Sequence, residues 1–391
     1  MTTHFVCFLL NRSLKTPYKE IAMLKFIVVF CSFFLVAHFS NNRISNNCSV
    51  TRYIVADLGV LQNHQSSRAF GVSEHGVVVG ESTQNFLTQN AFMCKKSGVM
   101  QEVMNFFGAG QCVAVAVSDS GHITGYYCDE NGISHGWLLY GENNGNKIRN
   151  LGTLGGNFCI PYDVNSSGVV VGCSFNSDYK NHAFMWNDGV MTDLFPTSDF
   201  AFATGINDAG EIVGFFVNES FESIAFLRRE KGEVINLGSL EHVGLAFSNA
   251  NGVNNHGQVV GRSSTLSGYS HAFIFTDGEM RDLGTLRKVN GTSDTSSEAF
   301  KINNHRVVIG ESVSLGSLAR PFVWSEKKGM QDLQKLLQSN ATDFSATTFH
   351  LERVSDINDA GEIVGWGYWG DIEEGDDGSS RFHAVLLTPV S

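Results

Sequence analysis

The sequence predicts an all-β protein, a seven-bladed β-propeller of four-stranded blades closed by an N-terminal strand that completes the last blade. Three observations predict it: one unit recurs seven times, each unit contains short β-type segments separated by Gly-containing turns, and the first and last copies are incomplete in complementary ways. The composition agrees. With 42% hydrophobic residues, 41 glycines and only 17% charged residues, the chain suits strands and turns better than helices.

The repeated unit is marked by a glycine that ends a twelve-residue segment. The seven segments align without gaps and end at Gly80, Gly125, Gly172, Gly214, Gly261, Gly310 and Gly365. Each reads as a hairpin: a strand ending in Val or Ile, a polar turn with Gly, and a β-branched strand. The turn glycine suits a positive φ, and the sixth copy has Arg306 instead, so we expect local strain of about 1 kcal/mol there.

Two further strands follow each hairpin. Eleven residues after the marker glycine, six copies begin an aromatic and apolar segment, such as HAFMW in the third copy. A polar turn and a fourth strand such as EMRDLG come next. Four strands per repeat fit a propeller blade, and an open solenoid is the main alternative.

The chain ends favour the propeller. The last copy stops after its third strand, HAVLLTPVS, whereas residues 55–61 (VADLGVL) match the fourth-strand segment at 280–286 (MRDLGTL). We therefore expect residues 55–61 to pair alongside residues 383–388 and to remove the exposed sheet edges. A solenoid would have no use for such complementary ends.

The first forty residues have the layout of a leader. Residues 1–40 are expected to be a signal peptide, with Met23 as an alternative start, because Lys25 precedes an apolar run at 26–37. That run is short for a membrane span of ~20 residues, although an uncleaved anchor is the alternative. Residues 41–391 are then a single propeller domain with no transmembrane segment, and we expect secretion to the periplasm or the outside of the cell. The net charge of −12 argues against nucleic acid and anionic membranes as partners.

The repeats resemble a known family. The HAF triplets at 182–184 and 271–273, together with NLGTLGG (150–156) and INDAGEIVG, are similar to the HAF-repeat family of bacterial proteins. The resemblance covers nearly all of residues 53–391, although Asn90, Gly136, Ile224 and Pro321 break the triplet. It implies an extracellular location and no catalytic residue.

The chemistry-bearing motifs favour structural roles. His135, His182, His271 and His383 stand at equivalent positions of different repeats, so we expect hydrogen bonds between strands and no shared metal ion. The GWGYWG segment at 365–370 matches GxGxxG but no helix follows it, so it predicts no dinucleotide site. We expect no cofactor, no metal and no catalytic constellation.

The cysteines leave two alternatives open. Cys112 and Cys159 stand at matching places in neighbouring repeats, thirteen residues before their marker glycines. In an oxidising compartment they could form a disulfide, and otherwise they are buried free thiols.

Loop length predicts the ligand site. From Gly365 to Ala384 the seventh copy has nineteen residues where the other six have eleven, and the connections between repeats also lengthen late in the chain. This seventh-repeat loop offers Trp366, Tyr368, Trp369, Asp371, Glu373 and Glu374. Aromatic faces beside carboxylates suit a sugar or a basic peptide, whereas the alternative is a solvated loop whose aromatics pack on the next repeat.

These observations favour a secreted, non-enzymatic module that binds a protein or carbohydrate ligand on the loop face of repeats 5–7. The alternative is a propeller-fold carbohydrate-active hydrolase or lyase, since propellers also support catalysis. A structural envelope protein is a third reading.

Overall fold

The computed structural model describes residues 52–85, 88–96, 98–103, 111–141, 147–241, 246–287, 291–338, 349–370 and 382–390. They belong to one compact unit, Val50–Ser391. The expected leader, residues 1–40 with Met23, lies outside the described residues. In the part of the chain that is described, we find no helix with the length and apolar character needed to cross a membrane.

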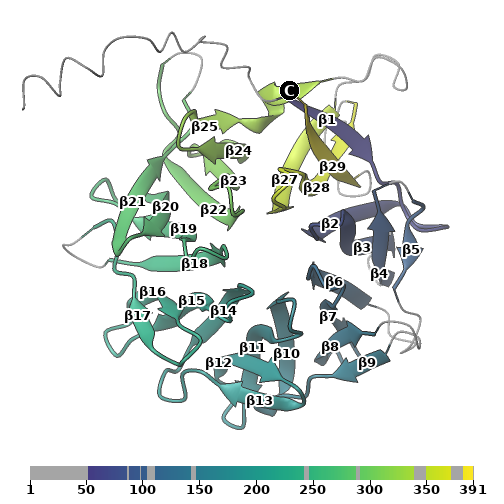
Figure 1. Ribbon diagram of the computed structural model, residues 1–391, viewed down its shortest axis with the longest axis vertical. Helices are drawn as coiled ribbons and strands as arrows, with labels where there is room; N and C mark the ends of the chain where they lie inside the picture. The colour runs from purple at the N-terminus through teal and green to yellow at the C-terminus, as the bar shows by residue number, and fades with distance from the viewer. Residues whose placement is uncertain are drawn as a thin grey trace, which may run out of the picture. The chain divides into compact units, whose positions relative to one another are not determined.

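The strands follow the sequence repeats, and we number the repeats accordingly (Figure 1). Repeat 1 contains β2 (Ser66–Val72), β3 (Val77–Asn85), β4 (Thr88–Lys95) and β5 (Gln101–Glu102). Repeat 2 contains β6 (Gln111–Val117), β7 (Ile123–Cys128), β8 (Ser134–Tyr140) and β9 (Lys147–Asn150). Repeat 3 contains β10 (Gly155–Val164), β11 (Val170–Asn176), β12 (Asn181–Asn187) and β13 (Val190–Asp193).

The later repeats have the same antiparallel order. Repeat 4 contains β14 (Ala201–Ile206), β15 (Ile212–Val217), β16 (Ser223–Arg228) and β17 (Val234–Asn236). Repeat 5 contains β18 (Ser248–Val253), β19 (Val259–Ser264), β20 (Ser270–Thr276) and β21 (Glu279–Gly284). Repeat 6 contains β22 (Ser296–Ile302), β23 (Val308–Val313), β24 (Arg320–Ser325) and β25 (Gly329–Asp332). Repeat 7 contains β27 (Phe349–Ile357), β28 (Ile363–Trp369) and β29 (His383–Val390), and the all-β prediction is confirmed.

A close backbone approach explains the marker glycines. In every repeat the register between the first two strands shifts, as between Ala69 and Gly71 in repeat 1. This bulge brings a first-strand carbonyl toward the second strand, so a Cβ atom on Gly80 would lie 2.0 Å from the oxygen of Arg68. The other six marker glycines face the same obstruction at 1.9–2.2 Å. Only glycine fits at this position without a backbone shift.

The hydrophobic cores lie between neighbouring repeats. The aromatic residue of the third strand is fully buried in six repeats, at Phe92, Trp137, Phe184, Phe226, Phe273 and Phe322. One cluster joins Val79 and Ala91 of repeat 1 to Ala114 and Trp137 of repeat 2. Each sheet therefore buries its apolar surface against the next sheet.

The N-terminal strand completes repeat 7. β1 (Arg52–Asp57) pairs antiparallel with β29, with Val55 opposite Leu387, as the sequence predicts for the start of residues 55–61. Residues after Asp57 leave the strand, but the backbone N–H of Leu58 still donates to the Ala384 carbonyl at 3.0 Å. β26 (Leu337–Gln338) pairs parallel with β1 and makes this sheet five-stranded, which the sequence did not indicate. A short 3₁₀ helix, η1 (Leu333–Leu336), precedes β26.

The contact between β1 and repeat 1 repeats the junctions found elsewhere. The Ser67 hydroxyl donates to the Gly59 carbonyl at 2.6 Å and accepts from the Ala384 N–H at 2.8 Å. Two other junctions have the same pair of bonds, formed by Ser248 with Gly238 and Ala225, and by Ser297 with Gly284 and Ala272. Repeat 7 thus joins repeat 1 as repeats 4 and 5 join their successors.

The expected hydrogen bonds between strands are found for His182, His271 and His383, whereas His135 bonds to a residue of the turn before its own strand. Asp57 on β1 and His383 on β29 are 2.9 Å apart, and the equivalent pairs are His182–Asp193 at 2.6 Å and His271–Asp282 at 2.8 Å. In repeat 2, where Asn150 replaces the aspartate, His135 contacts Asp129 at 3.1 Å. The HAF triplet and the DLG segment therefore carry the two partners of one bond between the third and fourth strands.

Because the His383–Asp57 bond holds the N-terminal strand, we predict a pH-dependent contribution to stability. The hydrogen bond to Asp57 raises the pKa of His383, although burial opposes the shift. A histidine with a raised folded pKa stabilises the fold below its unfolded value of 6.5 and loses this contribution as pH rises through the folded pKa. The free energy of unfolding should fall more between pH about 6 and 8 in the wild type than in His383→Gln. The control is His75→Gln, which removes an exposed histidine and should leave the pH dependence of the wild type unchanged. The same pH dependence of the free energy of unfolding in His383→Gln and in the wild type would contradict the prediction.

The expected strain at Arg306 yields a second prediction. Arg306 has φ 59°, where its equivalent Gly121 has φ 82° and open space around the position of a Cβ. Arg306→Gly should raise the free energy of unfolding by about 1 kcal/mol, and Gly121→Ala should lower it by a similar amount. Chemical denaturation measures both changes. Destabilisation by Arg306→Gly would show that the arginine side chain contributes more than the strain removes.

Candidate functional site

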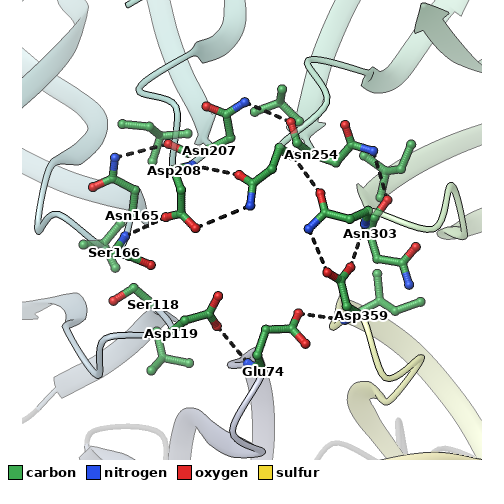
Figure 2. Close-up of a pocket in the computed structure, with 18 residues that line it drawn as sticks. Glu74, Ser118, Asp119, Asn165, Ser166, Asn207, Asp208, Asn254, Asn303 and Asp359 are labelled. Carbon is green, nitrogen blue, oxygen red and sulfur yellow. Dashed lines mark hydrogen bonds between the residues drawn. The ribbon is translucent and has the colours of Figure 1, made fainter.

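Hairpin turns from all seven repeats meet around one pocket of about 140 Å³ (Figure 2). Each turn contributes a polar side chain directly after the serine or asparagine that recurs at this position in all seven repeats. These residues are Glu74, Asp119, Ser166, Asp208, Asn255, Asn304 and Asp359. The first-strand residues Val117, Val164, Ile206, Val253, Ile302 and Ile357 lie beneath them.

A cycle of hydrogen bonds joins these turns. The backbone N–H of Asp208 donates to Asn255 Oδ1 at 2.9 Å, and that of Asn255 donates to Asn304 Oδ1 at 2.8 Å. The pattern continues through Asp359 to Glu74, whose Oε1 accepts from the Asp359 N–H at 2.7 Å. The backbone N–H of Glu74 in turn donates to Asp119 Oδ1 at 2.8 Å, and that of Ser166 donates to Asp208 Oδ1 at 2.9 Å.

The second and third repeats are linked differently. Ser166 has no carboxylate or amide to accept the equivalent bond. The Ser120 hydroxyl of repeat 2 instead donates to the Ser166 carbonyl of repeat 3 at 2.7 Å. Because Ser166 is bonded to Asp208 of repeat 4, this bond completes the cycle.

A deeper row of asparagine amides, from Asn165 in repeat 3 round to repeat 1, supports this cycle. Asn207 Nδ2 donates to the Asn254 carbonyl at 2.9 Å, and Asn254 Nδ2 donates to the Asn303 carbonyl at 3.0 Å. Asn358 extends it to the Ser73 carbonyl of repeat 1 at 3.2 Å. These asparagines are buried, so each amide satisfies a carbonyl that water cannot reach. The polar groups of the pocket therefore hold the repeats together, and this accounts for them without a ligand.

Three charged side chains lie one residue before the aliphatic residues of the pocket. Asp163 on β10, Lys301 on β22 and Asp356 on β27 occupy one repeat position, where the other four repeats have Gly71, Ala116, Gly205 and Gly252. Lys301 Nζ lies 3.0 Å from Asp163 Oδ2, so this ion pair joins repeats 3 and 6. Asp356 Oδ2 accepts from the Val72 N–H at 3.0 Å.

The charges of this cluster are coupled. Burial raises the pKa of Asp356 to about 6, although the Lys301 ammonium opposes the shift. Burial disfavours the charge of Lys301, but the carboxylates of Asp163 and Asp356 outweigh it and raise the lysine pKa. Burial raises the pKa of Glu74 at the rim as well, and the nearby carboxylates of Asp359, Asp119 and Asp356 add to the rise. The cluster therefore holds one stable cation and one carboxyl group that changes charge near pH 6.

A second group of side chains lies on the first two strands of repeats 5, 6, 7 and 1. The pocket lies at the turns where the first strands end, whereas this group lies closer to where they begin. We call it the arginine–tryptophan belt: Arg262, Glu298, Phe300, Glu311, Arg353, Trp366, Arg68 and Glu81. The guanidinium carbons of Arg68 and Arg353 lie 5.9 and 6.0 Å from the Trp366 ring centroid. Arg353 also lies 4.9 Å from the Phe300 ring, so cation–π contacts connect repeats 6, 7 and 1.

Each arginine of the belt has a carboxylate partner. The pairs are Arg68–Glu81 at 3.0 Å, Arg353–Glu311 at 3.0 Å and Arg262–Glu298 at 3.4 Å. Burial raises the pKa of Glu81 and Glu311, and their arginines oppose the shifts. The side chains of Arg68, Arg353 and Arg262 are 31%, 48% and 41% exposed, so part of each remains accessible to a ligand.

The predicted aromatic residues lie in a strand, not in a loop as we expected. Trp366, Tyr368 and Trp369 all belong to β28, because this strand extends to Trp369 opposite Phe349. Trp366 belongs to the belt. Tyr368 is buried and stacks on His350, and Trp369 packs against Phe349 at 4.6 Å. The predicted acidic residues Asp371, Glu373 and Glu374 lie outside the described residues.

The structure contains Cys112 and Cys159 as buried free thiols, so the disulfide alternative is not found. They lie in different core clusters, and burial raises their pKa values to about 11 and about 12. Within the described ranges, no group of three His, Cys, Asp or Glu side chains is placed to hold a metal ion.

The sequence contains a signal for both overlooked groups. In the aligned repeats, the residue after each marker glycine includes Glu81, Arg262, Glu311 and Trp366, and the residue before the conserved Val or Ile includes the charged cluster. Charged or aromatic residues at positions that vary inside an otherwise regular repeat are thus the signal that marks both groups.

No family model and no curated protein matches this chain. Among solved structures, a prolyl endopeptidase is 12% identical, with a TM-score of 0.51 over 84% of this chain and 51% of its own. Puromycin hydrolase is also 12% identical, with a TM-score of 0.51 over 78% of this chain and 51% of its own. The β-propeller domain of the trilobed protease from Pyrococcus furiosus is 12% identical, covers 75% of this chain and is covered in full, with a TM-score of 0.39. This chain spans about half the length of the first two proteins. The likenesses to the prolyl endopeptidase and to puromycin hydrolase concern the fold alone, which is of the β-propeller type.

The charged cluster yields a prediction for Lys301→Met. The change leaves the Asp163 and Asp356 carboxylates without their shared cation, and we expect it to lower the free energy of unfolding by about 2–3 kcal/mol at pH about 8. Because protonation of Asp356 removes one negative charge, the loss should be smaller at pH about 5. Lys96→Met is the matched control, since Lys96 also pairs with a buried carboxylate, Glu362, that does not belong to the charged cluster. A loss that is the same at both pH values would contradict the coupling.

Proposed function

We propose that the protein is a secreted, closed seven-bladed β-propeller of the HAF-repeat type that acts as a non-enzymatic binding module. Closure is supported by the hydrogen-bond cycle of the turns and by the pairing of β1 with β29. Secretion is supported by the apolar run at 26–37, and the family by the HAF and DLG segments.

The ligand site is the arginine–tryptophan belt. The single observation that carries this proposal is that Trp366 lies between two partly exposed arginines, each held in place by a carboxylate. A tryptophan face binds the apolar face of a sugar ring, and guanidinium groups bind carboxylates in bidentate fashion. We therefore propose an acidic carbohydrate as the ligand, bound on the side of repeats 5–7 and 1.

Glycan-array binding tests the proposal with paired arginine variants. Arg353→Ala and Trp366→Ala should each weaken binding to uronic-acid glycans about tenfold or more, because each loses a charge-assisted or stacking contact. Arg281→Ala is the matched control: Arg281 also lies over a tryptophan, Trp324, and pairs with Glu326, but on β21 outside the belt. Trp369→Ala controls for the loss of a tryptophan.

Two outcomes would contradict the proposal. Equal losses in Arg353→Ala and Arg281→Ala would mean that binding depends on stability or general charge. Binding of proteins with no glycan binding by the wild type would replace the ligand class with a protein partner.

A carbohydrate-active hydrolase or lyase is the second candidate. The observation that favours it is a pair of carboxyl groups in different environments, with Asp163 beside Lys301 and Asp356 shifted to a pKa of about 6. Release of shorter saccharides by the wild type and not by Asp356→Asn would support this activity over simple binding.

A further inference from the structure

Two aromatic residues occupy turn positions that favour glycine. In the connections between the second and third strands, Tyr179 has φ 59° and Phe221 has φ 62°. Their backbone N–H groups donate to the Asn176 and Asn218 carbonyls at 3.0 Å. Repeats 2 and 5 form the same turn with glycine, at Gly132 (φ 75°) and Gly268 (φ 78°).

These aromatic residues are unfavourable for the fold in two ways. A left-handed backbone is strained for a side chain with a Cβ, and glycine adopts it without this cost. In addition, Tyr179 is 68% exposed and Phe221 is 92% exposed, so their rings gain little from burial. A strained residue with an exposed apolar ring, where the same fold elsewhere has glycine, indicates a role at the surface.

A third exposed aromatic residue lies between the two turns. Phe200 precedes β14 and forms a parallel bridge with Asn181 of repeat 3, and its carbonyl accepts from the Val217 N–H of repeat 4 at 2.9 Å. Its side chain is 43% exposed and meets Phe202 edge-on at 4.9 Å. Backbone contacts thus place Phe200 beside the strands that flank the Tyr179 and Phe221 turns, and we call these three exposed aromatic residues of repeats 3 and 4 the aromatic patch.

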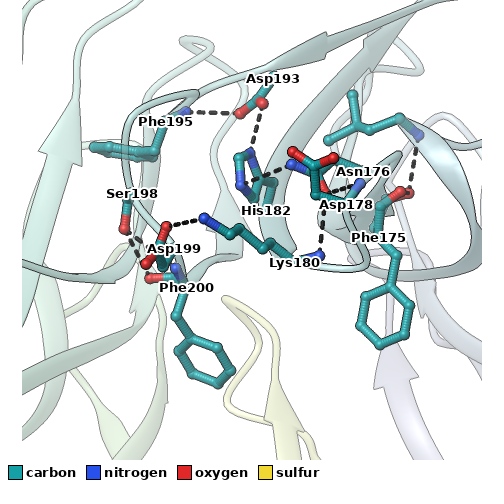
Figure 3. A network of polar contacts seen from close by, with 12 residues as sticks. Phe175, Asn176, Asp178, Lys180, His182, Asp193, Phe195, Ser198, Asp199 and Phe200 are labelled. Atoms are coloured by element: carbon teal, nitrogen blue, oxygen red, sulfur yellow. Dashed lines mark hydrogen bonds and ion pairs between the residues drawn. The ribbon is translucent and has the colours of Figure 1, made fainter.

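Polar contacts fix the backbone that carries this patch (Figure 3). Lys180, next to Tyr179, pairs with Asp199, next to Phe200, at 2.5 Å. Asn176 Oδ1 accepts from the Lys180 N–H, and Asn218 Oδ1 accepts from the Glu222 N–H in the other turn. Figure 3 shows the Phe200 ring pointing away from this network. The rings are therefore presented by ordered turns.

The charge around the patch is acidic. Asp178 precedes Tyr179, Glu219 and Glu222 flank Phe221, and Asp199 is 80% exposed. Lys180 adds one positive charge, which pairs with Asp199. Aromatic faces surrounded by carboxylates complement arginine or lysine side chains through cation–π and ionic contacts.

We propose that the Tyr179–Phe200–Phe221 patch docks a basic, arginine-rich segment of a partner protein. This surface belongs to repeats 3 and 4, so it is separate from the belt and does not depend on the glycan proposal. Its occupant carries positive charge, whereas the ligand proposed for the belt is acidic.

The test measures binding of a fluorescent peptide of alternating arginine and serine by anisotropy, with the full chain. We expect the double variant Tyr179→Gly/Phe221→Gly to weaken binding about tenfold or more. The same variant should be at least as stable to heat as the wild type, because glycine relieves the backbone strain. Loss of binding could then not be attributed to unfolding.

Two controls test whether peptide binding is specific to the patch, and does not arise from any exposed apolar residue or from peptide charge of either sign. Leu266→Ala alters an equally exposed tip, at 80%, in the repeat 5 turn of the same geometry and should leave binding unchanged. A peptide of alternating glutamate and serine should not bind. Unchanged binding by the double glycine variant, or a lower melting temperature in it, would overturn the proposal.

Other occupants of the patch would also appear in this experiment. Wild-type binding to phosphatidylcholine vesicles that the double variant loses would assign the patch to a lipid surface. A dimer seen by sedimentation that the double variant abolishes would assign it to a second copy of the chain. Either result overturns a basic partner segment, and neither bears on Arg353→Ala in the belt.

Discussion

The hydrogen-bond cycle of the seven turns is the interaction on which the rest of the structure depends. In repeats 1, 4, 5, 6 and 7 the turn donates its backbone N–H to the next repeat and accepts with its side chain from the previous repeat, so one turn contributes to two junctions. The buried asparagine amides beneath do the same for the carbonyls. Because these bonds join the ends of the first strands, the apolar faces of neighbouring sheets pack against each other and bury the third-strand aromatics.

The repeated hairpins leave few positions on the first two strands of each repeat free to vary. The side chains of the charged cluster and of the arginine–tryptophan belt occupy those variable positions. The marker glycines cannot change because a first-strand carbonyl occupies the place of a Cβ. The residue after each glycine has no such restriction, and there the chain places Trp366, Glu81 and Arg262. Small residues such as Gly252 lie beside Lys301, which extends to Asp163 three repeats away. The regular backbone thus positions an irregular set of side chains.

The sequence predicted the structural features that all repeats share, but it predicted much less about the features found in a single repeat. Strand order, the β1–β29 pairing and the interstrand histidines all follow from comparing copies, because the same local bond recurs in each copy. The ligand site was predicted from loop length, which does not show where a strand ends, so Tyr368 and Trp369 were wrongly expected in a loop. Lys301 and Asp163 could not be paired from the sequence, since 138 residues separate them.

Departures from the repeat are therefore the most informative residues for function. Where a departure relieves no strain and buries no surface, folding alone does not explain it. Arg306 is a departure that adds backbone strain, since it adopts a positive φ at a turn position where the other six repeats have glycine. Tyr179 and Phe221 go further, because they combine the same backbone cost with rings that remain in water. Since neighbouring copies form the same turn with glycine, the fold does not impose this cost, and that contrast is the basis for proposing a surface role for the two rings.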